Sequence, residues 1–335
     1  MKSSYVFYLI ILLFCIKSNI LCQENEYKYL DDYKEIHPNL FNNSLLNIIS
    51  YNIDIIVNAE EKTFASVLSA NIVLPSYGLP DSLSFSLDKS FLIEKIKYED
   101  TVISDIKYSD GSHNNTNSRL YSFFLPPAER KIRSKNEVEI SITYTGTISD
   151  EMTNPTKDYI EFTKNCNWYP FINSRTQYKY SLFVTIDKEY AIVSPANLLD
   201  RRRSDNKIRY EFDEKLPVSR IVFVALKNMK RKVKKYDDGT ALTLYYKNLS
   251  SFSANKAIVE IEWIFGFYSD RFLRIEKKKN ISAVFLPRDG DYYVSFPPFF
   301  VFPEKEIYAE ITEWKPYKQM FYKMCGTIAR FWWEN

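Results

Sequence analysis

The chain has 335 residues, which is long enough for two domains that each bury a core of their own. Its residues are 45% hydrophobic and 26% charged, a composition that is ordinary for a globular protein and excludes wholesale disorder. With 45 Lys and Arg against 42 Asp and Glu, the net charge of +3 is too small to predict nucleic acid as a partner.

Residues 1–22 have the pattern of a secretory signal peptide. A short, positively charged start precedes an apolar run from Tyr5 to Ile16, and polar sequence begins at Gln23. The apolar run is shorter than the roughly 20 residues that a membrane span needs, although a retained anchor is the alternative. We therefore expect export to a periplasm, a cell surface or the medium. A lipid anchor on Cys22 is not favoured, because such sites prefer a small residue where Leu21 stands.

Residues 23–48 are a polar lead-in, and strand patterns begin at residue 49. Residues 82–87 alternate strictly between polar and apolar side chains, which indicates a sheet with one buried face. Similar patterns recur at 53–57, 64–74, 91–98, 138–144, 182–186, 208–212 and 221–226. The turn Asp237-Asp238-Gly239-Thr240 predicts a hairpin that joins 230–236 to 241–246, and residues 147–165 are predicted to be a long polar loop. Residues 49–247 are thus predicted to form one mainly β domain, an antiparallel β-sandwich or saddle.

The pattern changes near residue 250. Apolar residues at helical spacing over 257–265 follow the cap-forming Ser253 and Asn255, which predicts a helix. A strand is predicted at 281–286, a helix that opens at Pro303, and a last helix over 317–333. Residues 248–335 are therefore predicted to be a small α+β segment. The aromatic run from Phe296 to Phe302 fits either a buried strand or an exposed binding surface.

Several segments resemble the amino-terminal half of the M1, or gluzincin, aminopeptidases. The strands between Tyr51 and Ile96, the tripeptide Tyr144-Thr145-Gly146, the segment 167–171 (Asn-Trp-Tyr-Pro-Phe) and Asp213–Ser219 are similar to that family's saddle-shaped β domain. Residues 263–268 look like the end of the first helix of its catalytic domain. The resemblance implies a β domain followed by the start of a thermolysin-like catalytic domain, which in the family is a zinc peptidase.

The zinc motif of that family is not intact here. The family carries His-Glu-x-x-His on a helix, where the i,i+4 spacing puts both imidazoles on one face and the Glu activates water. In the best match, Gly326 and Arg330 stand at the histidine positions and Thr327 at the glutamate position, and the positive charge of Arg330 repels zinc. The family's third ligand would lie beyond Asn335, and residues 289–294 (Asp-Gly-Asp-Tyr-Tyr-Val) replace its Gly-x-Met-Glu-Asn element. No zinc and no other cofactor are expected.

Other candidate chemistry is sparse. The histidines number two, His37 and His113, and both lie in loop-like sequence, where exposed side chains are more common than catalytic ones. Cys166 and Cys325 fit one disulfide or, better, two separate buried thiols. Two basic runs are candidates for contact with an anionic surface or, alternatively, are solvated strand edges. Their residues are Arg201, Arg202, Arg203, Lys230, Arg231, Lys232, Lys234 and Lys235.

The leading hypothesis is an exported, non-catalytic M1-aminopeptidase-like protein. It would bind a protein or peptide, or serve as an envelope component, with a membrane surface as a further candidate contact and no nucleic acid partner. One alternative is a fragment of a split or shortened zinc aminopeptidase whose ligands come from a separate chain. The other is a β-sandwich adhesin or carbohydrate-binding module.

Overall fold

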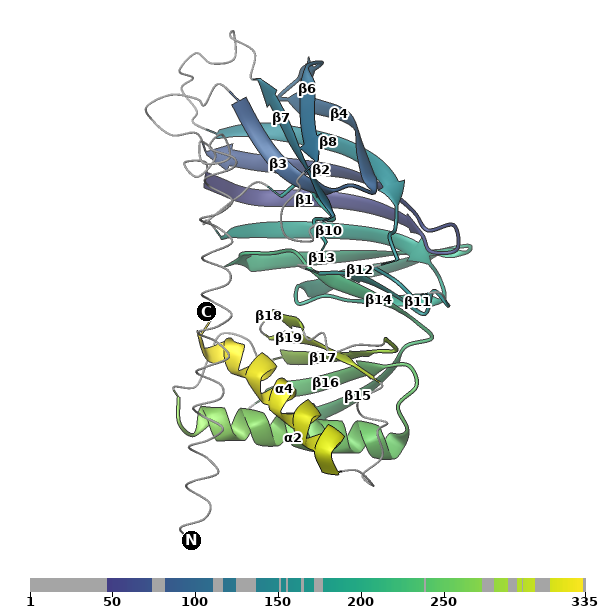
Figure 1. Ribbon diagram of the computed structural model, residues 1–335, viewed down its shortest axis with the longest axis vertical. Coiled ribbons are helices and arrows are strands. Elements are labelled where there is room, and N and C mark those ends of the chain that lie inside the picture. Colours follow the sequence, from purple (N-terminus) through teal and green to yellow (C-terminus); the bar gives the residue numbers. More distant parts are fainter. Residues whose placement is uncertain are drawn as a thin grey trace. The chain divides into compact units, whose positions relative to one another are not determined.

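The computed structural model of the protein describes residues 47–333. The exceptions are 74–81, 111–116, 125–136, 151, 155, 164–165, 172–176, 238, 273–279, 289–293, 297 and 305–313, and for 314–320 and 331–333 only the backbone is described. The predicted leader, His37, His113 and nearly all of the predicted lead-in lie outside the described residues. The chain divides into two compact units, and the division falls between Ala225 and Leu226 (Figure 1).

A large sheet of eight strands dominates the first unit. In order across the sheet the strands are β12 (Asn197–Ser204), β13 (Lys207–Val218), β10 (Tyr178–Asp187), β1 (Asn47–Asn58), β2 (Thr63–Val73), β8 (Glu137–Thr147), β4 (Phe91–Tyr98) and β5 (Thr101–Ile103). Neighbouring strands run antiparallel except at the centre, where β1 and β10 are parallel. Burial alternates along β1, β2 and β10, so one face of the sheet is in the core and the other faces solvent.

Two smaller sheets pack into the same core as the buried face of the large one. The first contains β3 (Ser82–Asp88), β7 (Ser118–Phe124) and β6 (Ile106–Asp110), and the second contains β11 (Tyr190–Val193), β14 (Phe223–Lys227) and β9 (Tyr159–Phe162). The strictly alternating residues 82–87 place Leu83, Phe85 and Leu87 in this core. The prediction of a mainly β fold is thus confirmed, with one parallel pair where an antiparallel arrangement was expected.

The segment 167–171 joins these sheets to one another. Its backbone pairs with β3 through Ser86 and Phe171, whose amide nitrogens each donate to the other's carbonyl oxygen at 3.0 and 2.9 Å. The indole N–H of Trp168, which is fully buried, donates to the carbonyl oxygen of Ile221 at 3.2 Å, just before β14. The Tyr169 hydroxyl accepts from the Ile221 N–H at 3.3 Å. The rings of Tyr169 and Tyr51, on β1, meet edge to face at 5.8 Å.

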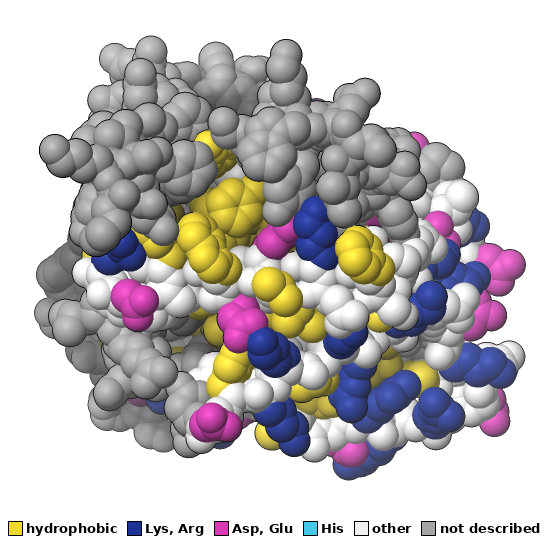
Figure 2. All heavy atoms as spheres, turned by 90° about the horizontal axis from the view of Figure 1, so that it is seen from below, with side chains coloured by type: hydrophobic (Ala, Val, Ile, Leu, Met, Phe, Trp, Pro, Cys, Tyr) yellow, Lys and Arg dark blue, Asp and Glu magenta, His cyan; other side chains and the backbone are white. Residues whose placement is uncertain are grey.

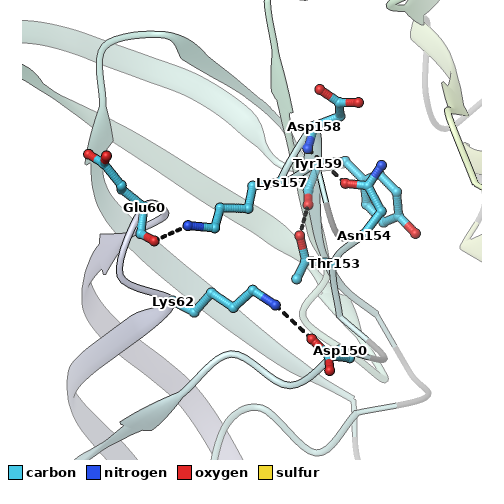
Figure 3. A network of polar contacts seen from close by, with 8 residues as sticks. All are labelled: Glu60, Lys62, Asp150, Thr153, Asn154, Lys157, Asp158 and Tyr159. Atoms are coloured by element: carbon cyan, nitrogen blue, oxygen red, sulfur yellow. Dashed lines mark hydrogen bonds and ion pairs between the residues drawn. The ribbon is translucent and has the colours of Figure 1, made fainter.

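Residues 147–165 are not the long loop that was predicted. They contain β9, all four residues of which are buried, and a polar network fastens the preceding turn to the β1–β2 hairpin (Figure 3). Lys62 forms an ion pair with Asp150 at 2.6 Å, and Lys157 donates to the carbonyl oxygen of Glu60. The short strand was missed because a charged residue, Glu161, interrupts its four-residue pattern.

Within its described residues, the second unit is a five-stranded sheet with two helices. Its strands, in order across the sheet, are β15 (Lys230–Lys235), β16 (Ala241–Tyr246), β17 (Asn280–Leu286), β19 (Phe299–Pro303) and β18 (Val294–Phe296). The central strands β16, β17 and β19 are parallel to one another. Residues on both sides of β19 are buried, as expected of parallel strands, so the aromatic run 299–302 is a buried strand.

The described helices are α2 (Ser251–Ser269) and α4 (Trp314–Trp333), which confirm the helices predicted over 257–265 and 317–333. The Ser250 hydroxyl caps α2 by accepting from the Ser253 N–H at 3.0 Å. Ile261 and Ile264 of α2 share a core with Leu244 of the sheet. Pro303 is the last residue of β19, and the helix predicted to open there falls on residues 305–313, which lie outside the described residues.

Glu304 ties the end of β19 to the start of α2. Its carboxylate is fully buried and accepts hydrogen bonds from the backbone N–H groups of Lys247 and Asn248 at 2.7 and 2.8 Å. Burial raises the pKa of Glu304 above its ordinary value, and the hydrogen bonds from Asn248 and Lys247 oppose that shift. The loop before α2 is thus positioned by a charged group that has few contacts with water.

The boundary between the units differs from the predicted one at 247–248. The hairpin β15–β16 belongs to the second unit, because β16 pairs with β17 and places Leu242, Leu244 and Tyr246 in the core shared with α2. Alternation identified these residues as strands but does not say which sheet they join.

The cysteines and the helices settle two smaller points. Cys166 and Cys325 are each buried thiols rather than halves of one shared disulfide, and burial raises the pKa of the Cys166 thiol. Among the described residues, no helix combines the length and the apolar character that a membrane crossing requires.

Substitutions of two glycines by alanine are predicted to change the free energy of unfolding in opposite directions. A Cβ at Gly146 would lie 2.1 Å from the Ser90 carbonyl oxygen and 2.8 Å from the Phe91 Cα, whereas a Cβ at Gly266, inside α2, meets nothing within 4 Å. We expect Gly146→Ala to lower the free energy of unfolding by about 2 kcal/mol or more through backbone overlap. Gly266→Ala should raise it by about 0.5–1 kcal/mol, since alanine favours the helix.

Denaturant unfolding followed by circular dichroism measures both effects. If Gly146→Ala gave no soluble protein while Gly266→Ala gave a normal yield, that result would also support the predicted destabilisation by Gly146→Ala. A Gly146→Ala variant as stable as the wild type would contradict the close approach of β4 and β8 at this position.

Candidate functional site

The residues at the zinc-motif positions lie on α4. Gly326 and Arg330 are one turn apart and half-buried, and Thr327 is buried. The helical conformation is the one that the i,i+4 motif requires. The Thr327 hydroxyl donates to the carbonyl oxygen of Lys323 at 2.8 Å, one turn earlier on the same helix.

These side chains do not fit zinc. Gly326 offers no donor atom, the Thr327 hydroxyl is already bonded to its own helix, and Arg330 is a permanent cation with no acceptor. Elsewhere in the part of the chain that the structure describes, no three His, Cys, Asp or Glu side chains gather as a metal site would need.

The outward face of the large sheet carries a different candidate site. The strand register aligns its exposed side chains in rows that cross several strands. One row is Arg209, Thr185, Ile56, Ala65, Thr145 and Leu92, and the next is Glu211, Phe183, Asp54, Val67, Thr143 and Lys95. The rows bring together residues that are up to about 150 positions apart, as the contact between Asp54 and Arg209 shows.

The rows enclose a hollow of about 590 Å³. Small side chains lie at its centre, on β2 and β8, and larger ones lie on the flanking strands. The central residues are Ala65, Ser69, Thr143 and Thr145, and the flanking ones include Phe183, Arg209 and Glu94. Ile56 and Val67, which are 55% and 48% exposed, add apolar surface to the hollow. The shape therefore results from side-chain size and needs no break in the sheet.

Charged groups define both sides of the hollow. The Arg209 guanidinium crosses the Phe183 ring at 5.0 Å and donates to both carboxylate oxygens of Asp54, at 3.0 and 2.8 Å. Hydrogen bonding to Asp54 raises the pKa of Arg209 above its ordinary value. On the other side, Glu94 accepts from the Thr145 hydroxyl at 2.8 Å. These groups are fixed in place and can orient a polar ligand.

The predicted anionic-contact residues lie on two edge strands. Arg201, Arg202 and Arg203 are on β12, at one edge of the large sheet, and are exposed. Arg202 pairs with Asp200, and Arg201 lies over the Tyr210 ring at 5.3 Å. The second set is on β15, at the edge of the other sheet, and consists of Lys230, Arg231, Lys232, Lys234 and Lys235. The two sets belong to different units.

Sequence reasoning missed the hollow. Asp54, Thr145 and Arg209 lie on three strands, each of which reads as an ordinary alternating strand with polar outward positions. The available signal was the run of small outward residues along β2 and β8, and it becomes informative only once β1, β2, β8 and β10 are known to be neighbours.

Comparison of the sequence with models of known protein families, and with curated protein sequences, found no match.

Proposed function

We propose that this is an exported, non-catalytic protein, similar to the amino-terminal half of the M1 aminopeptidases, that binds an extended peptide or protein segment. The hollow on the outward face of the large sheet is the observation that carries this proposal. Its small centre leaves room for the side chains of a bound segment, and Ile56 and Val67 offer apolar contact. In this proposal, residues 248–335 derive from the start of a thermolysin-like catalytic domain.

The chemistry on α4 supports the absence of peptidase activity. A zinc peptidase needs imidazole or carboxylate ligands and a general base, and Gly326, Thr327 and Arg330 supply neither. Arg330 places a cation where the family has a neutral ligand. Export is supported by the sequence pattern of residues 1–22 alone.

The side chains of the hollow favour a peptide over a glycan. Carbohydrate-binding faces present aromatic rings for the sugar to stack on. Among the described residues that line this hollow, Phe183 alone has an aromatic ring, and the Arg209 guanidinium covers it at 5.0 Å. Exposed aliphatic groups and fixed charges of both signs suit a peptide with mixed side chains. The side chains that line the hollow therefore support a peptide as the ligand.

The first prediction concerns metal and activity. The purified chain should contain no stoichiometric zinc and should not hydrolyse aminoacyl amide substrates, since its α4 residues provide no zinc ligand. Elemental analysis after dialysis and a fluorogenic peptidase assay measure these properties. Tightly bound zinc, or hydrolysis that a chelator abolishes, would refute the non-catalytic proposal and favour an enzyme whose ligands come from elsewhere.

The second prediction concerns the hollow. Peptides selected from a displayed random library against the wild-type chain should bind Ala65→Trp at least about tenfold more weakly, because the indole fills the centre of the hollow. Fluorescence anisotropy with a labelled selected peptide measures the affinity. Ala65 is flanked by Ile56 and Thr145 in the register, so the new ring lies between the two sides.

Val102→Trp is the matched control. Val102 is 53% exposed on β5, at the edge of the same sheet, and does not line the hollow. This variant adds the same ring and should keep the wild-type affinity. Equal binding by Ala65→Trp and wild type would place the peptide elsewhere, and hits on a glycan array that Ala65→Trp removes would favour a carbohydrate-binding module.

A further inference from the structure

Helix α2 has two apolar faces, and only one of them is in the core. Ala254, Ile261 and Ile264 are buried against the sheet. The opposite side carries Phe252, Val259 and Trp263, which are 67%, 59% and 45% exposed. These three residues, seven and four positions apart, lie along one line of the helix and are called the outer stripe here. Folding of the unit alone does not account for such exposed groups.

A basic edge strand lies beside this stripe. Lys232 of β15 bonds to the Asn255 side chain, and Lys234 forms an ion pair with Glu262. Asn255 is three positions from Phe252 and four from Val259, and Glu262 is three positions from Val259, so the lysines border one side of the stripe. Figure 2 looks onto the side on which α2 lies in Figure 1 and shows Lys and Arg side chains gathered beside exposed hydrophobic ones.

β15 carries more basic residues than the two lysines that contact α2. Lys230 is exposed on the same side of the strand as the two lysines that contact α2, whereas Arg231 and Lys235 are exposed on its other side, because successive side chains of a strand alternate. Lysines on an edge strand discourage pairing with other sheets. That role explains the strand but not the phenylalanine, valine and tryptophan exposed next to it.

We infer that the outer stripe and β15 together dock the protein on an anionic lipid bilayer. The bilayer interface accepts aromatic and aliphatic side chains from a helix that lies in its plane, while lysines and arginines around them contact anionic headgroups. This inference is independent of the peptide-binding proposal, since it uses residues of the second unit alone.

The local geometry favours a bilayer over an acidic protein segment. A protein partner anchors side chains in pockets, and the void beneath Trp263, bounded by Ile264, Phe267, Tyr268 and Cys325, is too small to hold a water molecule. Trp263 stacks on Phe267 at 5.9 Å and contacts Phe321 at 5.7 Å, which fixes its ring on the helix surface. A stripe whose tryptophan ring is held by its neighbours, with no room beneath it for a partner's side chain, suits a soft apolar layer.

Co-sedimentation of the purified chain with lipid vesicles tests the inference. The wild type should bind phosphatidylcholine vesicles that contain about 30% phosphatidylserine and should bind pure phosphatidylcholine far less. The variant Lys230→Ala, Lys232→Ala should bind the anionic vesicles about 25-fold more weakly, since each basic residue near the surface contributes about fivefold. Phe252→Ser should weaken binding about tenfold through lost apolar contact.

The matched control removes the same charge from the other side of β15. Arg231→Ala, Lys235→Ala should keep nearly wild-type binding, because these side chains leave the strand on the side away from α2. All variants share one N-terminus, so differences between them report β15 and α2, and circular dichroism confirms that each is folded. Equal losses in the two double variants, unchanged binding by Phe252→Ser, or no binding of the wild type to anionic vesicles would overturn the inference.

Discussion

Trp168 and Tyr169 provide the contact on which the first unit depends. Their segment pairs with β3 through its backbone, bonds to Ile221 through both side chains, and meets Tyr51 of the large sheet. Three sheets thereby share one polar and aromatic connection inside an apolar core. Because each of these hydrogen bonds is buried, losing one leaves a polar group without water to replace its partner, which costs about 1–3 kcal/mol. These hydrogen bonds therefore fix the position of the sheets relative to one another, which apolar burial alone would not do.

In this arrangement the outward face of the large sheet does not contribute to the hydrophobic core. The core is built from the inward residues of its strands, such as Ile53 and Leu68, so the outward residues are constrained only by strand pairing. Small side chains at Ala65 and Thr143 would be costly cavities in a core, but on this face they shape a surface. Asp54 and Arg209 can also be retained there as a pair, since both remain about half exposed.

Much of the fold could be predicted from sequence, because alternation and helical spacing are local properties. Residues 82–87 and 208–212, and the helices α2 and α4, follow such patterns. The features that the sequence did not predict depend on contacts between distant segments. They are the parallel pairing of β1 with β10 and the pairing of β16 with β17. The hollow was not predicted for the same reason, because Asp54 and Arg209 are brought together by the register of the strands between them. The α4 positions could be located because they lie within one helix, where spacing alone fixes the geometry.

The parallel pairing of β1 also has a consequence for the order of folding. β1 can form its hairpin with β2 as soon as both are synthesised, but its other neighbour, β10, comes much later, as the bond from the Ala59 N–H to Asp187 across 128 residues shows. Until β10 arrives, the second edge of β1 presents unpaired backbone groups and an apolar face. We therefore expect closure of this sheet to be a late step of folding, and misassociation to be favoured before residue 187 has been synthesised.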